Sequence, residues 1–191
     1  MPRCWCRVPR TRRPASGPLP SAVASRLVGP AAVTARDGLR ARLATQLDAL
    51  DFILAGATPA LLDARPVSGD WSARENLAHL ARHATVFLER LGRILVEERP
   101  RLGRYRAEDD PDWPAWSALP SDETLRRLRD VRARLIAWVE GRTPAELERE
   151  GLHPSFGAMT IPRWLEFFLL HEAHHLYTAL TCLAEARRRA S

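Results

Sequence analysis

The sequence predicts an all-α protein: a four-helix bundle with a long crossover between the second and third helices, after a disordered N-terminal tail. Four leucine-rich stretches of about 20 residues repeat apolar side chains at helical spacing, and no stretch alternates apolar and polar residues with a period of two. A chain of 191 residues that is 46% hydrophobic is long enough to bury one core. We therefore expect a tail at residues 1–32 and one bundle domain at residues 33–188.

The tail is predicted from its composition. Residues 1–32 are rich in Pro, Arg, Ser and Ala and show little periodicity, which is typical of disorder. Up to Arg36 the chain has 7 arginines and no acidic residue, whereas from Asp37 onward it has 22 arginines against 23 acidic residues. The net charge of +6 therefore belongs to the tail, and we expect no nucleic-acid binding by the folded domain.

The first helix is predicted at residues 34–56. Gly56 and Pro59 end it, and a short linker bounded by prolines follows at residues 59–66. The apolar side chains that recur at the spacing of one helix face are Leu39, Leu43, Leu47, Leu50 and Leu54.

The second helix has a clear start. Ser72 and Glu75 form a capping box, in which each side chain bonds a free backbone N–H, and Pro100 closes the helix. Residues 100–120 then form a long connection, which we expect to be a crossover or a lid. A connection of this length allows the second and third helices to run parallel.

The third helix is predicted at residues 121–140, with Ser121 or Asp122 as its cap. Thr143-Pro144 begins a short turn or helix that reaches about Arg149.

The fourth helix follows a loop at residues 153–157. Thr160 is expected to cap it, and Pro162 is tolerated in its first turn. Its apolar run, Ile161–Leu183, is the longest in the chain. We expect no β-strand anywhere, because no stretch shows alternation.

The cysteines favour a reducing compartment. Cys4, Cys6 and Cys182 make no disulfide framework, so we expect a cytoplasmic protein. No apolar run reaches the length of a membrane span without a charge or a histidine, so we expect no membrane partner.

Half of the six histidines lie in the fourth helix. His171 and His175 are four residues apart and share one helix face, where two neutral imidazoles can hold one divalent metal. On a helical wheel His175 falls inside the apolar stripe and His171 at its edge, whereas His174 points away. Glu172 lands near the centre of the stripe, where a carboxylate is costly unless it is paired or bound to a metal.

Two other kinds of metal site compete with this interpretation. Residues 171–175 also have the pattern H-E-x-x-H of zinc metalloproteases. In the common families the third ligand lies downstream, but the 16 residues after His175 contain no histidine, and such enzymes normally carry a sheet. A di-iron carboxylate site needs a second Glu-x-x-His pair besides Glu172 and His175, and the chain has none.

A third ligand must therefore come from upstream. The other histidines are His79, His83 and His153. His79 and His83 are again four residues apart, on the second helix, and periodicity alone slightly prefers His83.

These residues resemble a known family. Residues 71–80, Trp-Ser-Ala-Arg-Glu-Asn-Leu-Ala-His-Leu, resemble the second-helix signature of the DinB-like superfamily, and residues 153–160 with 171–175 resemble its last-helix signature. The resemblance covers roughly Asp37–Glu185. It implies a four-helix bundle with a long crossover after the second helix. It also implies a divalent metal, often nickel or zinc, held by three histidines, here His79, His171 and His175.

The resemblance further implies a metal-dependent enzyme that acts on a small molecule. Some relatives look like thiol-dependent transferases or isomerases that use bacillithiol, mycothiol or glutathione. The family often has Arg-Gly-Gln after the second histidine of the last helix, and this chain has Leu176-Tyr177-Thr178, so roles at those positions do not carry over. We expect a thiol S-transferase or a small hydrolase with a divalent metal and, for the transferase, a low-molecular-weight thiol as co-substrate.

Two questions stay open at this point. Glu172 could orient a ligand imidazole or act as a catalytic base, or it could be a structural carboxylate paired with an arginine. The protein could also be a non-catalytic metal-binding or stress-response bundle, acting as a homodimer, or a metalloprotease. A metal in a roomy, partly polar pocket favours the enzyme, whereas an apolar-plugged pocket without metal favours the non-catalytic bundle.

Overall fold

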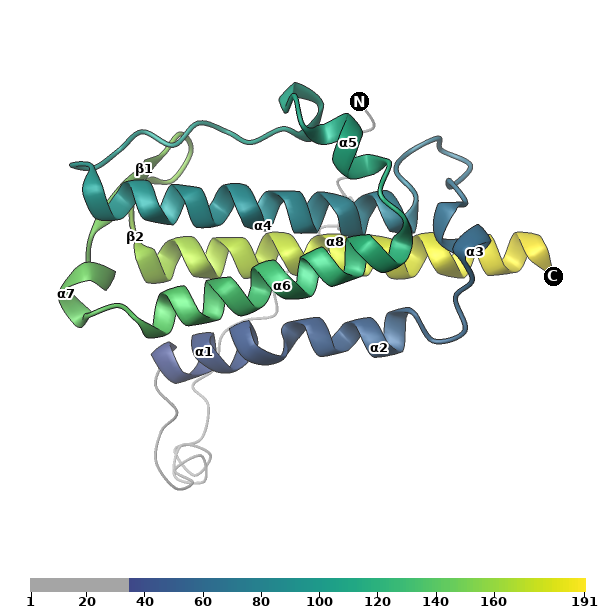
Figure 1. The fold of residues 1–191 in the computed structure, drawn as a ribbon, viewed down its shortest axis with the longest axis horizontal. Helices are drawn as coiled ribbons and strands as arrows, with labels where there is room; N and C mark the ends of the chain where they lie inside the picture. Colours follow the sequence, from purple (N-terminus) through teal and green to yellow (C-terminus); the bar gives the residue numbers. More distant parts are fainter. Residues whose placement is uncertain (1–34) are drawn as a thin grey trace, which may run out of the picture. The chain divides into compact units, whose positions relative to one another are not determined.

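The structure, a computed structural model, describes residues 35–191, so the tail predicted at residues 1–32 lies outside the described part. Helical segments pack side by side and confirm the predicted bundle (Figure 1). The first segment is α1 (Ala35–Thr45) followed by α2 (Ala49–Ile53), and the others are α4 (Ala73–Val96), α6 (Ser121–Glu140) and α8 (Ile161–Ala190).

The long crossover gives the bundle its topology. In Figure 1, α4 and α6 run in one direction, whereas α1, α2 and α8 run in the other. Arg74, in the first turn of α4, donates a hydrogen bond to the carbonyl of Leu119 just before α6, which holds the two starting ends together. The second and third long helices are therefore parallel, as the length of their connection allowed.

The first helix is interrupted, contrary to the prediction of one helix at residues 34–56. A 3-10 turn, η2 (Gln46–Asp48), separates α1 from α2. A 3-10 turn keeps residues i and i+3 on one side, so the leucine spacing continues across the turn. The turn therefore cannot be recognised from the sequence. In this turn the Gln46 amide donates to the carbonyl of Leu169 and to the carboxylate of Glu172, both on α8.

Among the helices whose cap residues are described, three begin with a side-chain cap. Ser72 and Glu75 form the predicted capping box of α4, and Thr143 forms another at the short helix expected after α6. The linker after α2 also contains one helical turn, which Thr58 caps. These short helices are α3 (Pro59–Asp63) and α7 (Pro144–Leu147).

The predicted caps of α6 are wrong. Helix α6 begins at Ser121 itself. Ser121 and Asp122 therefore lie inside its first turn, and Pro120 occupies the cap position. Asp122 there faces the positive end of the helix dipole. Thr160 does occupy the cap position of α8, but its side chain makes no capping bond.

A short hairpin precedes α8, so the expectation of no strand is wrong. Strand β1 (Glu150–His153) pairs antiparallel with β2 (Gly157–Thr160). Strands of 4 residues are too short to give a period-two signal. Of the loop predicted at residues 153–157, residues 154–156 form the turn, and His153 and Gly157 are the strand residues that pair beside it. Gly157 has a φ of 69°, a conformation that favours glycine.

The crossover is tied to α4. It contains η3 (Ala107–Asp109) and α5 (Trp113–Ser117). Arg82 of α4 forms an ion pair with Asp110 at 2.7 Å, and the Tyr105 hydroxyl donates to the same carboxylate. These bonds hold the crossover against the starting half of α4.

Two clusters of buried apolar side chains fill the bundle, and polar side chains separate them. One cluster surrounds Phe87 and Trp164, and the other surrounds Leu77. On α8 the first cluster ends at Leu169 and the second begins at Leu176. Between them lies a polar layer, formed by His79, His83, Arg132, His171, Glu172 and His175.

Among the described helices, none combines the length and the apolar character that a membrane span needs.

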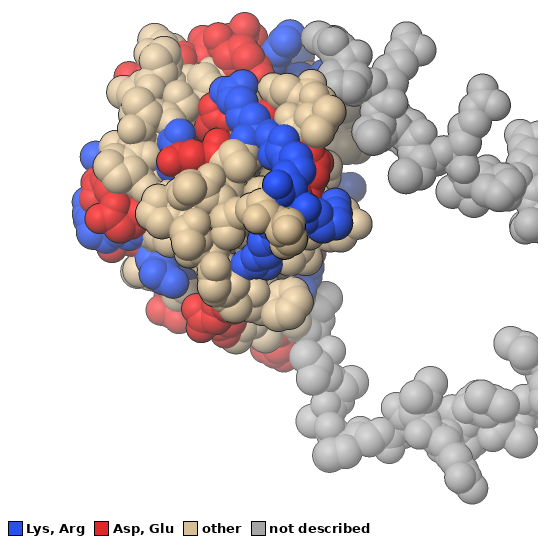
Figure 2. Space-filling view, turned by 90° about the vertical axis from the view of Figure 1, so that its right-hand side faces the viewer, with Lys and Arg blue, Asp and Glu red and all other residues tan. Residues whose placement is uncertain are grey.

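Helix α8 ends in basic residues, Arg187–Arg189. On the face seen in Figure 2, a run of basic side chains crosses the surface with acidic side chains on both sides. Charges of both signs therefore share this end of the bundle.

Gly151 in β1 provides a steric test of the fold. A Cβ at this position would lie 2.9 Å from the side chain of Ile94, which is buried on α4. We expect Gly151→Ala to lower the free energy of unfolding by about 1–3 kcal/mol, the usual effect of overpacking. In Gly92→Ala, the control, the new Cβ meets nothing within 4 Å, so denaturant titration should show no loss of stability. A Gly151→Ala protein as stable as the wild type would contradict the close approach.

Candidate metal centre

The polar layer brings together histidines from two distant parts of the chain. Asn76, His79 and His83 lie at positions i, i+3 and i+7 of α4 and share one face. His171 and His175 share a face of α8, which runs antiparallel to α4 (Figure 1). The structure brings all three predicted ligands together: one ring nitrogen each of His79, His171 and His175 lie within 4.8 Å of one another.

Two of these nitrogens lie at a distance that suits a metal. His79 Nε2 and His171 Nε2 are 3.3 Å apart. Two nitrogens that each lie about 2.0–2.1 Å from a tetrahedral zinc are separated by about 3.3–3.4 Å. When both rings carry their proton on Nδ1, the two Nε2 lone pairs face each other, and a shared cation removes the repulsion. Three neutral imidazoles are a donor set that zinc and nickel accept.

Asn76 orients His175. The Nδ1 atom of His175 lies 2.8 Å from Asn76 Oδ1, and the Asn76 amide nitrogen donates to the carbonyl of Ser72. The amide oxygen therefore faces the ring, His175 Nδ1 is the donor, and Nε2 keeps its lone pair for a ligand bond. Asn76 is not among the site residues predicted from the sequence. A buried asparagine, 2% exposed, on the histidine face of a helix is the signal that could have found it.

Burial keeps these imidazoles neutral. Loss of hydration, assisted by neighbouring histidines, lowers the pKa of His79 to about 3 and that of His171 to about 4. The same causes lower the pKa of His175 to about 2. A neutral imidazole has a lone pair for a metal at any ordinary pH. The Nδ1 atoms of His79 and His171 are buried without a hydrogen-bond partner.

The crossover and α5 cover His79. Periodicity placed His79 outside the buried stripe of its helix, but α4 packs against α5, α6 and α8, so its buried surface is wider than one stripe. The rings of Trp71, Tyr105 and Trp113 lie around His79, with centroids 5.0, 5.8 and 6.1 Å away. These partly buried aromatic side chains shield the His79 ring from water.

The other three histidines lie outside this group. His83 is the nearest, with its ring centroid 4.1 Å from that of His171. His174 is exposed on α8, as the wheel indicated. His153 lies in the hairpin, where its Nδ1 accepts bonds from two backbone N–H groups of its own turn. It therefore does not close over the three nitrogens.

Glu172 is engaged at a helix interface. Its fully buried carboxylate forms an ion pair with Arg132 of α6 and accepts a 2.8 Å hydrogen bond from Gln46. Arg132 also donates to the carbonyl of Leu43, at 2.7 Å. Because other side chains occupy both carboxylate oxygens, the geometry favours the structural interpretation of Glu172.

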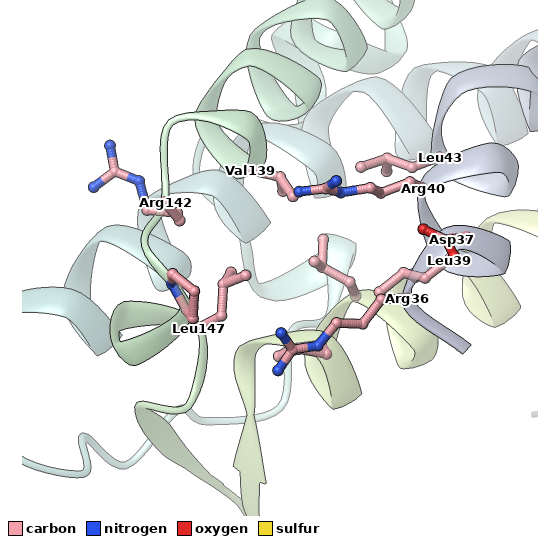
Figure 3. A pocket seen from close by; sticks show the side chains of 11 residues that line it. Arg36, Asp37, Leu39, Arg40, Leu43, Val139, Arg142 and Leu147 are labelled. Carbon is pink, nitrogen blue, oxygen red and sulfur yellow. The ribbon is translucent and has the colours of Figure 1, made fainter. Parts of the chain in front are cut away.

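A pocket of about 360 Å³ opens elsewhere in the bundle, between α1, α7 and the start of α8 (Figure 3). Leu39 and Leu147 are among the apolar side chains that line it. The side chains of Arg36 and Arg40 extend across it, whereas the Arg142 guanidinium points away. No histidine lines this pocket, so it is not an approach to the three nitrogens.

The family of this chain follows from its match to a known protein family. Residues 30–179 match the DinB superfamily. The chain belongs to the DinB superfamily. This membership confirms the family resemblance that residues 71–80, 153–160 and 171–175 indicated.

Solved structures share the fold of this DinB-superfamily protein. YfiT from Bacillus subtilis, provisionally described as a metal-dependent hydrolase with an unusual four-helix bundle topology, is 21% identical. The match covers 83% of this chain and 90% of YfiT, with a TM-score of 0.64. TT2238, described as a four-helix bundle protein, is 27% identical, with a TM-score of 0.54 over 75% of this chain and 95% of its own.

A protein of Oceanobacillus iheyensis, provisionally named as a metal-dependent hydrolase, is 28% identical over 118 residues. The match covers 60% of the DinB-superfamily chain and 66% of the relative. The chain thus spans just under two thirds of that relative's length.

The buried histidines should make the metal-free protein sensitive to mild acid. A histidine of the unfolded chain binds a proton near pH 6.5. In the fold the pKa values of His79 and His171 are about 3 and about 4, because burial disfavours the charged ring. Between these values the unfolded chain binds more protons, so the free energy of unfolding falls as the pH falls from about 6.5 to about 4.

We therefore expect the chelator-treated protein to have a lower Tm at about pH 5 than at about pH 7.5 in a thermal unfolding series. His174→Gln, a change at an exposed histidine, should keep most of this dependence, because burial is the main cause of the lowered pKa values of His79 and His171. A Tm that does not change over this range would contradict buried, neutral histidines.

The Arg132–Glu172 pair gives a stability test with an internal control. Arg132→Met should lower the free energy of unfolding by about 3–5 kcal/mol, because it leaves the Glu172 charge buried without its partner. Combining it with Glu172→Leu should restore most of the loss, since two apolar side chains then replace the pair. Guanidinium titration of the three proteins measures both effects.

The same double variant tests the two interpretations of Glu172. If this carboxylate is structural, the double variant keeps the wild-type activity per bound metal, and any weaker metal binding reflects a changed orientation of α8. Lost activity with intact stability and intact metal affinity would support Glu172 as a catalytic base.

Proposed function

We propose that this protein is a metal-dependent enzyme whose centre is one divalent metal ion, zinc or nickel, held by His79, His171 and His175. The observation that carries the proposal is the convergence of three ring nitrogens, one each from His79, His171 and His175, with His175 already oriented by Asn76. The provisional name of the Oceanobacillus iheyensis relative points to the same class of protein.

Three protein nitrogens leave a ligand position open, which is typical of catalytic rather than structural sites. A divalent metal supplies Lewis acidity there, and this lowers the pKa of a water or of a thiol at the open position. The proposed reaction takes one of two forms. In hydrolysis of a small molecule the nucleophile is water, and in thiol S-transfer it is a soluble thiol. Cys182 does not serve as this thiol, because it is buried and its Sγ contacts the carbonyl of Trp71 at 3.5 Å.

The chain's own residues prepare the centre for this chemistry. Asn76 holds the tautomer and the orientation of His175. Trp71, Tyr105 and Trp113 restrict water around His79, which strengthens electrostatic interactions inside the site. The Arg82 ion pair keeps this aromatic cover against α4, so a substrate that reaches the histidines must pass beside it or displace it.

Single replacements of the histidines test the ligand set. We expect the protein, purified without a histidine tag, to bind one zinc or nickel per chain. His79→Ala, His171→Ala and His175→Ala should lose it, because removal of a ligand costs more than the roughly 10- to 100-fold typical of outer hydrogen bonds. His83→Ala, His153→Ala and His174→Ala should keep one metal per chain at saturating metal, as measured by elemental analysis.

Two outcomes would overturn parts of this assignment. If His83→Ala emptied the site and His79→Ala kept it full, the ligand from α4 would be wrong. If His174→Ala emptied it, the orientation of α8 would be wrong as well.

An activity assay distinguishes the reaction classes. The metal-loaded protein is assayed on small esters and amides, with and without added low-molecular-weight thiol, and His171→Ala serves as the inactive control. Turnover without thiol supports the hydrolase, and turnover that requires thiol supports the transferase. A metal-loaded protein inactive in both assays would favour the non-catalytic metal-binding bundle.

A further inference from the structure

His83 belongs to the polar layer but has no role in the proposed function. Its side chain is 4% exposed, and its Nδ1 is buried without a hydrogen-bond partner. Its ring lies against the rings of Phe87 and Phe168, so an apolar side chain would suit the same space. An unpaired polar atom in such a place is destabilising and requires an explanation.

The ring next to His83 also has a polar atom without a hydrogen-bond partner. His171, a proposed ligand, also has a buried Nδ1 without a partner. The centroids of the His83 and His171 rings are 4.1 Å apart, with the planes at 45°. An imidazole that binds a metal through Nε2 carries its proton on Nδ1, and this N–H almost always donates to an acceptor.

Two other acceptors near the proposed ligands, on Asn76 and Glu172, are already engaged. Asn76 Oδ1 accepts from His175. The two oxygens of Glu172, the carboxylate next to His171 in the chain, accept from Arg132 and Gln46. The imidazole of His83 is thus a neighbour of His171 that still has an unused ring nitrogen.

Neither Nδ1 is bonded in the structure, but the two rings are in contact. We propose that His83 is a positioning residue whose Nδ1 accepts the Nδ1–H of His171 when that ring binds the metal through Nε2. The bond fixes the tautomer and the ring orientation of His171, as Asn76 does for His175. His83 itself does not bind the metal. This inference rests on the proposed function, because His171 needs the outer bond as a metal ligand.

Zinc affinity and the visible spectrum of the cobalt-substituted protein test the inference. His83→Leu removes the acceptor and keeps an apolar side chain, so the Kd for zinc should rise about 10- to 100-fold and the cobalt bands should shift. Asn76→Leu removes the acceptor of His175 and measures how much zinc affinity is lost when a ligand ring loses its outer hydrogen bond. His83→Asn, whose Oδ1 can take the place of Nδ1, should recover most of the affinity and the wild-type spectrum.

Phe168→Leu is the packing control, because it alters a neighbour of His83 without removing a polar atom. It should bind zinc nearly as tightly as the wild type. Equal weakening in His83→Leu, His83→Asn and Phe168→Leu would show that packing, not the acceptor, matters, and the inference would be wrong.

The remaining outcomes separate this inference from the proposed function. If the wild type binds zinc tightly and His83→Leu matches it in affinity and spectrum, the inference alone is overturned. If His83→Leu loses the metal as completely as His171→Ala, His83 is a ligand and not a positioning residue. A wild-type protein that binds no zinc, nickel or cobalt overturns both.

Discussion

The buried ion pair between Arg132 and Glu172 determines how α8 is turned about its axis. Arg132 and the turn between α1 and α2 hold the Glu172 carboxylate on one side of the helix. Measured around the axis of α8, His171 lies about 100° from Glu172, and His175 lies about 60° from Glu172 in the same direction. Both histidines therefore face α4. A buried pair adds little net stability compared with apolar side chains. Its use here is orientation, since a rotation of α8 that broke the pair would also move the histidines away from α4.

The apolar clusters on both sides of the polar layer have two opposing effects on the histidines. Excluding water keeps the rings neutral, with lone pairs free at ordinary pH. The same exclusion removes the water that each ring N–H would otherwise bind, so each needs a partner inside the protein. Asn76 meets this need for His175, whereas the Nδ1 atoms of His79 and His171 remain unpaired. The geometry of the layer is therefore that of a site whose polar groups are only partly satisfied by protein.

The sequence predicted the features that depend on nearby residues. The capping box of Ser72 and Glu75 lies within one turn, and the crossover shows as a long gap between periodic stretches. The pairs that join distant segments carry no local signal: Arg82 with Asp110 is separated by 28 positions and Arg132 with Glu172 by 40. For the α4 ligand, family resemblance selected His79 against a helical wheel that preferred His83. The wheel assumed one buried face, but α4 is covered on several sides.

The centre joins ring nitrogens that are 92 positions apart in the chain, one from α4 and two from α8. Neither helix alone offers the full set, so the set exists only after the crossover and α6 have been placed and α8 has docked. With the proposed metal bound, metal binding and folding are thermodynamically linked. A ligand present at about 100 times its Kd stabilises the native state by about 2.7 kcal/mol. The lifetime of this bundle in a cell would then follow the supply of free metal, because molecules made without it unfold and are degraded more readily.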